Sequence, residues 1–126
     1  MKDKPYNGGT WTEARYNSFI KSALRSASQR WPPRYHVLND AKVGKRINPK
    51  SGRLAEHYIC AACRQAFPGK EIQVNHITPV VPTTGFDSWD GVISRLFCEK
   101  SGLEALCIPC HKQITRSENE ERKNND

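Results

Sequence analysis

The sequence is poor in apolar side chains and contains no long hydrophobic run. Apolar residues make up 37% of the chain, and the mean hydropathy is -0.74. No segment approaches the roughly 20 consecutive apolar residues of a membrane-spanning helix, and the first residues lack the apolar stretch of a secretory signal. These absences argue against a membrane protein and indicate a soluble, cytoplasmic one with no membrane partner.

The chain is also too short for a large hydrophobic core. Its 126 residues leave room for one small domain with extensions. A core this poor in apolar side chains needs reinforcement by a metal, a disulfide or a partner. A reducing cytoplasm keeps cysteines as thiols, so closely spaced cysteines predict a metal site before they predict disulfides.

Four of the five cysteines form two C-x2-C pairs with 43 residues between them, namely Cys60, Cys63, Cys107 and Cys110. Each pair directs two sulfurs at one point, and two pairs together complete a tetrahedral Zn²⁺ shell with no position left for substrate. The spacing therefore predicts a structural zinc. The alternative is four buried cysteines without a metal. Cys98 stands alone in an apolar run and is expected to be a small buried residue.

Positive charge is concentrated in the first half of the chain. Residues 1–56 carry twelve Lys or Arg against four acids, whereas residues 57–126 carry eight against nine. A field of this sign favours a polyanion, and nucleic acid is the partner that we expect. The alternative is a solvated basic face without a partner. The candidate DNA-binding residues are Arg15, Lys21, Arg25, Arg30, Lys42, Lys45, Arg46, Lys50 and Arg53.

Helical periodicity in the N-terminal part predicts one helix. Thr10 and Glu13 have the spacing of a capping box, and apolar residues recur at helical intervals as far as Trp31, where Pro32 and the next proline stop the pattern. Residues 34–56 have no such pattern and are expected to be an irregular basic arm or linker. We therefore expect a basic helical extension and arm over residues 1–56.

The second half has a different residue pattern, and residues 57–126 are expected to form a domain held together by the metal. Alternation over residues 71–77 predicts a strand that carries His76, and residues 112–123 are rich in charged helix formers. Strand, second cysteine pair and helix together indicate an α+β fold. His36 and His57 have no comparable context and are expected at the surface.

Residues 58–123 resemble the HNH endonucleases, in particular the small ones encoded by tailed phages. The matching segments are Tyr58-x-Cys60-x2-Cys63, Val74-Asn75-His76-Ile77-x-Pro79-Val80, Gly85-Phe86-x2-Trp89-Asp90, Arg95-Leu96-Phe97-Cys98 and Leu103-x2-Leu106-Cys107-x2-Cys110-His111. The resemblance implies a ββα-metal core that binds one catalytic cation, Mg²⁺, Mn²⁺ or another divalent ion. By position, His76 would be the general base, and Asn75 and His111 would be cation ligands.

Three positions depart from the family pattern. Asn75 stands where the family usually has Asp, and an amide oxygen is a weaker ligand than a carboxylate for a hard cation. Ser101 and Gly102 stand where the family has the Asn of its name, and the Lys of the family's C-H-x-x-K-T ending is missing, since His111 is followed by Lys112-Gln113-Ile114-Thr115. These departures predict a weakened activity.

The resemblance implies a phage-encoded enzyme that nicks or cuts double-stranded DNA in the bacterial cytoplasm, as a monomer or homodimer. One alternative is an inactive HNH-fold protein that binds DNA or serves as a phage accessory protein. A second alternative is a zinc-stabilised module that binds protein.

Overall fold

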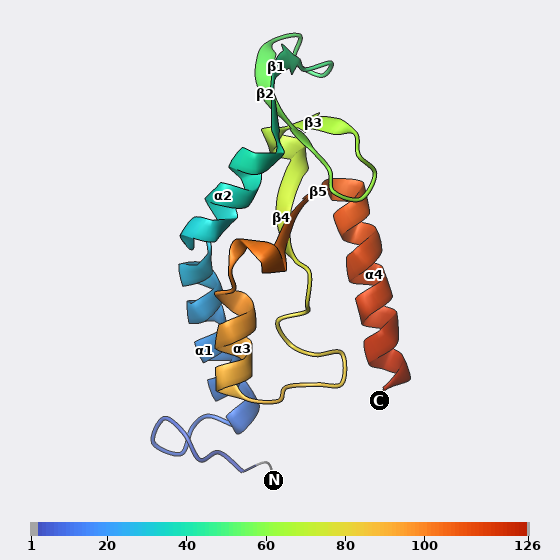
Figure 1. Ribbon diagram of the computed structural model, residues 1–126. Helices are drawn as coiled ribbons and strands as arrows, with labels where there is room; N and C mark the ends of the chain where they lie inside the picture. Colours follow the sequence, from blue (N-terminus) through green and yellow to red (C-terminus); the bar gives the residue numbers. More distant parts are fainter. Residues whose placement is uncertain (1–2, 126) are drawn as a thin grey trace. The chain divides into compact units, whose positions relative to one another are not determined.

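The computed structural model describes residues 3–125 and confirms an α+β fold (Figure 1). The helices and strands are α1 (Glu13–Ser28), α2 (Pro32–Ala41), β1 (Lys42–Ile47), β2 (Leu54–Ile59), β3 (Ala66–Pro68), β4 (Ile72–His76), α3 (Trp89–Leu96), β5 (Leu103–Cys107) and α4 (Ile108–Asn124). Two short 3-10 turns, Gly69–Glu71 and Lys100–Gly102, precede β4 and β5. The chain divides into two compact units, Met1–Trp31 and Pro32–Asp126. The sequence suggested a division after residue 56.

The first unit consists of a short turn and α1. Thr12, not Thr10, caps the helix, since its hydroxyl accepts a hydrogen bond from the Arg15 N–H at 3.2 Å. The predicted capping box of Thr10 and Glu13 is therefore wrong. An antiparallel bridge between Tyr6 and Trp11 holds the intervening residues in a turn, so the helix cannot start earlier. The Thr10 hydroxyl instead donates to a carbonyl within this turn.

The expected irregular arm at residues 34–56 is wrong. α1 ends at Ser28, before the predicted end at Trp31, and Pro32 and Pro33 begin α2, because the first turn of a helix does not need their missing N–H groups. The strands β1 and β2 follow and pair as an antiparallel ribbon that extends away from the rest of the second unit (Figure 1). The basic segment is thus ordered secondary structure.

Two antiparallel sheets form the second unit. The first has the order β1-β2-β3, and the second is the pair β4-β5. In the second sheet His76 lies opposite Leu103, and Asn75 lies opposite Glu104. The predicted strand over residues 71–77 is confirmed to within one residue at each end. α2 packs against β5, and α4 follows β5 directly and packs against both strands.

The core of the second unit is small and gathers around β4 and β5. Its buried cluster consists of Val37, Cys60, Ile72, Leu103, Ala105, Leu106 and Cys107. Two members are cysteines of the C-x2-C pairs, so the candidate metal ligands are part of the core. A core of this size agrees with the expectation that a metal reinforces the domain.

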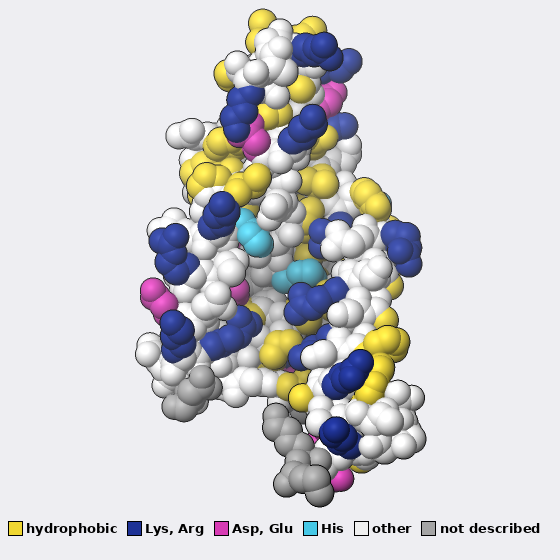
Figure 2. Space-filling model, turned by 180° about the vertical axis from the view of Figure 1, so that it is seen from behind, with side chains coloured by type: hydrophobic (Ala, Val, Ile, Leu, Met, Phe, Trp, Pro, Cys, Tyr) yellow, Lys and Arg dark blue, Asp and Glu magenta, His cyan; other side chains and the backbone are white. Residues whose placement is uncertain are grey.

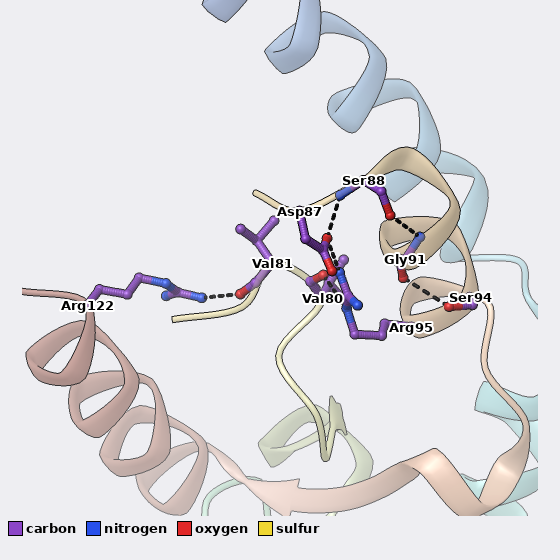
Figure 3. A network of polar contacts seen from close by, with 8 residues as sticks. All are labelled: Val80, Val81, Asp87, Ser88, Gly91, Ser94, Arg95 and Arg122. Atoms are coloured by element: carbon purple, nitrogen blue, oxygen red, sulfur yellow. Dashed lines mark hydrogen bonds and ion pairs between the residues drawn. The ribbon is translucent and has the colours of Figure 1, made fainter. Parts of the chain in front are cut away.

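The segment between β4 and α3 is fixed by arginine side chains (Figure 3). Arg95 donates from Nε to the Val80 carbonyl at 2.8 Å and from a guanidinium N–H to Asp87 at 2.7 Å. From α4, Arg122 donates to the Val81 carbonyl at 3.0 Å. The sequence did not predict α3, which Ser88 caps by accepting from the Gly91 N–H.

Candidate functional site

The first cysteine pair is held by a tight turn at the end of β2. The Arg64 N–H donates to the Cys60 carbonyl at 2.9 Å, and Arg64 has a φ of +66°. The Cys63 N–H points at the Cys60 sulfur, 3.5 Å away. The turn therefore directs both sulfurs of the pair to one side.

The second pair lies where β5 becomes α4. Cys107 ends the strand as the N-cap of α4, and Cys110 lies in the first turn, after a proline that suits this position. α4 begins at Ile108, several residues before the predicted helix over 112–123. This early start places Cys110 and His111 on one helical turn.

The structure brings the four paired cysteines together. Their sulfurs lie within 4.8 Å of one another, and those of Cys63 and Cys107 are 3.9 Å apart. Zn–S bonds of about 2.3 Å in a tetrahedron place sulfurs about 3.8 Å apart. The cluster can therefore hold a metal ion and is compatible with structural zinc. Among residues 3–125 it is the one group of three or more Cys, His, Asp or Glu with this geometry, and Cys98 is not part of it.

The thiols in the cluster have divergent pKa values. At Cys60, burial opposes ionisation, but hydrogen bonds from the backbone of Cys107, Cys63 and Ala62 outweigh it and lower the pKa to about 6. The neighbouring Cys107 side chain, and then burial, raise the pKa of Cys110 to about 12. Burial also raises the pKa of Cys107. Without a cation the cluster thus favours one thiolate, and a bound metal must displace protons from its neighbours.

His76 is half-buried and ends β4. Its Nε2 lies 3.0 Å from the carbonyl oxygen of Leu96, at the end of α3. A carbonyl can only accept, so in the neutral ring Nε2 carries the proton and Nδ1 carries the lone pair. This contact fixes both the orientation and the tautomer of the imidazole.

Asn75 is held by a cross-strand contact. Its side-chain amide donates to the Glu104 carboxylate at 3.2 Å, and both residues are half-buried. With Nδ2 occupied by this bond, Oδ1 is the atom of Asn75 that can face a cation. Glu104 also places a negative charge next to a neutral candidate ligand. The sequence analysis missed Glu104, because only the register of β4 and β5 reveals its position.

Gly102 lies beside Cys98 and has no room for a side chain. A Cβ at this position would lie 2.9 Å from the Cys98 sulfur. The Gly102 carbonyl accepts a hydrogen bond from the Ile77 N–H at 3.0 Å, directly after His76. A glycine is therefore required by packing at this position.

The four histidines have different environments. His111 is half-buried in the first turn of α4, and His36 is exposed on α2 as expected. His57 was expected at the surface, but it is 5% exposed and its Nδ1 lies 2.8 Å from the Ala55 carbonyl. It is buried because β2 is the central strand of its sheet. Figure 2 shows two histidine side chains close together on one face of the molecule.

The predicted DNA-binding residues fall in both compact units. In the second unit Lys42, Lys45, Arg46, Lys50 and Arg53 are all exposed. In the first unit Arg25 and Arg30 are exposed, Lys21 is half-buried, and the Arg15 guanidinium lies 4.7 Å from the centre of the Trp11 ring. Arg15 therefore combines exposure with an aromatic contact that limits its freedom.

No protein-family model matches the chain, and neither the curated proteins nor the solved structures include a significant match. Among the described residues, no helix is both long and apolar enough to cross a membrane.

Proposed function

We propose that the protein is a metal-dependent DNA endonuclease with an HNH-type site formed by β4, β5 and α4. Two paired strands followed directly by a helix have the order of a ββα-metal core. Asn75 and His76 end β4, and His111 lies on the first turn of α4. The proposal includes a phage origin and action in the bacterial cytoplasm, which the resemblance suggests.

The observation that carries the proposal is the contact between His76 and the Leu96 carbonyl. A general base needs a fixed ring with its lone pair on a defined nitrogen, and this contact assigns the lone pair to Nδ1. The Leu96 carbonyl also offers the support for which the sequence provided no candidate.

The chemistry then follows for phosphodiester hydrolysis. His76 Nδ1 takes a proton from a water molecule, whose oxygen attacks the phosphorus while the bond from phosphorus to the 3′ oxygen breaks. A divalent cation, when bound, neutralises the charge on the scissile phosphate and the leaving oxygen. After cleavage the proton on His76 returns to solvent, and the leaving oxygen gains one.

The candidate cation ligands fit a divalent ion of intermediate hardness. Asn75 offers a neutral oxygen and His111 a ring nitrogen, while Glu104 places its carboxylate 3.2 Å from the Asn75 amide. A mixed oxygen and nitrogen set suits Mn²⁺, Co²⁺ or Ni²⁺ better than Mg²⁺, which prefers oxygen ligands and water. We therefore expect activity with Mn²⁺ or Ni²⁺ to exceed that with Mg²⁺.

Relaxation of supercoiled plasmid tests the proposal. The zinc-loaded protein is assayed with Mg²⁺, Mn²⁺ or Ni²⁺ and without added metal, since a strong chelator would also remove structural zinc. His76→Ala should lower cleavage by at least about 100-fold, the lower range for a lost general base. His36→Ala, a change at an exposed histidine, should have no effect. Equal cleavage by both variants would refute the role of His76.

A second candidate function is DNA binding without cleavage, and the neutral side chain of Asn75 favours it. Asn75→Asp separates the two possibilities. If only this variant cleaves, the natural protein is a binding protein with a disabled nuclease site. If the natural protein cleaves and Asn75→Asp binds Mn²⁺ more tightly, Asn75 is a weak but sufficient ligand.

A further inference from the structure

The outer part of the β1–β2 ribbon is a two-stranded structure. β3 pairs only with residues 57–59 of β2, whereas residues 45–47 of β1 pair with residues 54–56. We call residues 45–56 the outer ribbon. It therefore extends past the edge of the three-stranded part of the sheet (Figure 1).

Charge on and next to the outer ribbon is predominantly positive. Residues 42–56 contain five Lys or Arg, all exposed, against one acid, the half-buried Glu56 at the inner end of the ribbon opposite Lys45. Lys50 pairs with Glu71 at 3.2 Å, but its side chain is 76% exposed and stays within reach of a ligand. The other cations are Lys42, Lys45, Arg46 and Arg53. A polyanion is the complementary partner.

An exposed apolar pair lies at the end of the ribbon. Ile47 and Leu54 are 65% and 68% exposed and lie directly opposite each other as the last pair before the turn. Apolar cross-strand pairs are ordinarily covered, and natural edge strands avoid exposed apolar side chains. An apolar tip flanked by cations suits a ligand that carries apolar groups between anionic ones.

The tip is preorganised by its own hydrogen bonds. The Asn48 N–H donates to the Arg53 carbonyl at 2.8 Å, and the Gly52 N–H donates to the Asn48 carbonyl at 2.7 Å. Gly52 has a φ of +72°, which favours glycine. The Asn48 side chain accepts from the Lys50 N–H at 3.0 Å. A turn ordered in this way loses little conformational entropy when it binds.

We propose that the outer ribbon inserts into the major groove of double-stranded DNA. A groove about 12 Å wide admits a two-stranded ribbon, and its floor presents the methyl groups of thymine between two rows of phosphates. Ile47 and Leu54 contact these methyl groups, and the five cations contact the phosphates. The choice of DNA as partner rests on the proposed function, but the insertion does not require cleavage.

Fluorescence anisotropy without added divalent cations tests the insertion. Two duplexes are compared that are identical except that uracil replaces thymine throughout. The natural protein should bind the thymine duplex about fourfold more tightly for each methyl group that it buries. Ile47→Ser with Leu54→Ser should remove this preference. Ile93→Ser, which changes a 43% exposed isoleucine on α3, should keep it.

The contribution of the cations to DNA affinity can be measured separately from that of the apolar pair. Lys45→Gln with Arg46→Gln should weaken binding to both duplexes alike and reduce the slope of log affinity against log salt by about 2. The two double variants thus separate phosphate contacts from base contacts. Zinc content and circular dichroism of each variant check that it is folded.

Three outcomes would overturn the insertion. The first is equal affinity of the natural protein for the two duplexes. The second is that the Ile47→Ser, Leu54→Ser variant sediments as a smaller oligomer than the natural protein while its thymine preference is unchanged. The tip would then be a contact between copies of the chain. The third is that the same variant loses binding to vesicles containing phosphatidylserine while its thymine preference is unchanged. A retained preference in a protein that does not cleave would refute the nuclease proposal alone.

Discussion

The two ends of α4 are anchored by different kinds of interaction. Its first turn contributes Cys110 to a cluster of four sulfurs, whereas Arg122 in its last turn donates to the Val81 carbonyl at 3.0 Å. The first anchor can be closed by a metal ion, and the second is a side-chain hydrogen bond on the loop before α3. A structural metal contributes about 10 kcal/mol or more, while a typical hydrogen bond contributes about 1 kcal/mol. The cysteine end should therefore determine whether the second unit folds, and the arginine end should adjust the loop.

Removal of the metal should have the largest effect. Cys60→Ser is expected to abolish tight zinc binding and to leave the second unit unfolded, because about 10 kcal/mol of binding energy is comparable to the whole stability of a small domain. Thermal unfolding followed by circular dichroism, together with zinc content, measures this. Cys98→Ser is the matched control and should retain the metal. If the two variants lost zinc equally, the four-cysteine assignment would be wrong.

The metal anchor should also depend on pH. The pKa values of Cys107 and Cys110 are raised above the ordinary thiol value, so both are protonated at pH 7 and must each release a proton when zinc binds. These two protons alone should make zinc affinity rise by at least about 100-fold per pH unit near neutrality, and fall by at least the same factor per unit as pH decreases. Calorimetry in buffers of different ionisation enthalpy counts the released protons. Release of none would contradict the expected state of the thiols.

A smaller effect is expected in the segment between α3 and β5. Gly102→Ala would place a Cβ 2.9 Å from the Cys98 sulfur, and such overpacking should lower the free energy of unfolding by about 1–3 kcal/mol. Cys98→Ala removes that sulfur, so the double variant should recover part of the loss. Chemical denaturation of both single variants and of the double variant measures the coupling. Strictly additive losses would show that the two positions do not interact.

The smallest effect on stability should follow from changes in the loop before α3, which Arg95 holds from α3 as Arg122 does from α4. Arg95→Lys keeps the charge but loses the paired contacts to the Val80 carbonyl and Asp87, so amide exchange in residues 77–88 should speed up while zinc content stays constant. Arg116→Lys on the exposed side of α4 is the control. Because Arg95 directly precedes Leu96, whose carbonyl contacts His76, we also expect a lower kcat if the proposed nuclease activity is present. Unchanged exchange in the loop would show that Arg95 does not hold it.

The contact of Arg95 also has a defined pH range. The hydrogen bond from Arg95, and then the one from the Ser88 N–H, lower the pKa of Asp87 below its ordinary value of 3.8. A lowered acid pKa means that the contact is fully present above the ordinary value and is lost as pH falls through the lower, folded-state value. Amide exchange in the loop should therefore be the same at pH 5 and pH 7, once corrected for its intrinsic rate.

Regular patterns in the sequence were sufficient for some elements and not for others. The alternating segment that forms β4 and the two C-x2-C pairs were predictable because local spacing determines them. The basic segment after Pro33 was not, since its ribbon is mostly exposed and therefore lacks an apolar face that would produce alternation. The helix start at Thr12 was missed because a bridge between Tyr6 and Trp11 overrides the capping signal at Thr10.

The sequence by itself determined which residues can bind metal, because ligand type and spacing are local properties of the two cysteine pairs. Only the tertiary structure decided how His76 and Asn75 are held. The Leu96 carbonyl lies 20 residues from His76, and the Glu104 carboxylate lies 29 residues from Asn75. Neither partner has a local signal, since a backbone carbonyl is common to all residues and a single glutamate gains meaning only from the register of two strands.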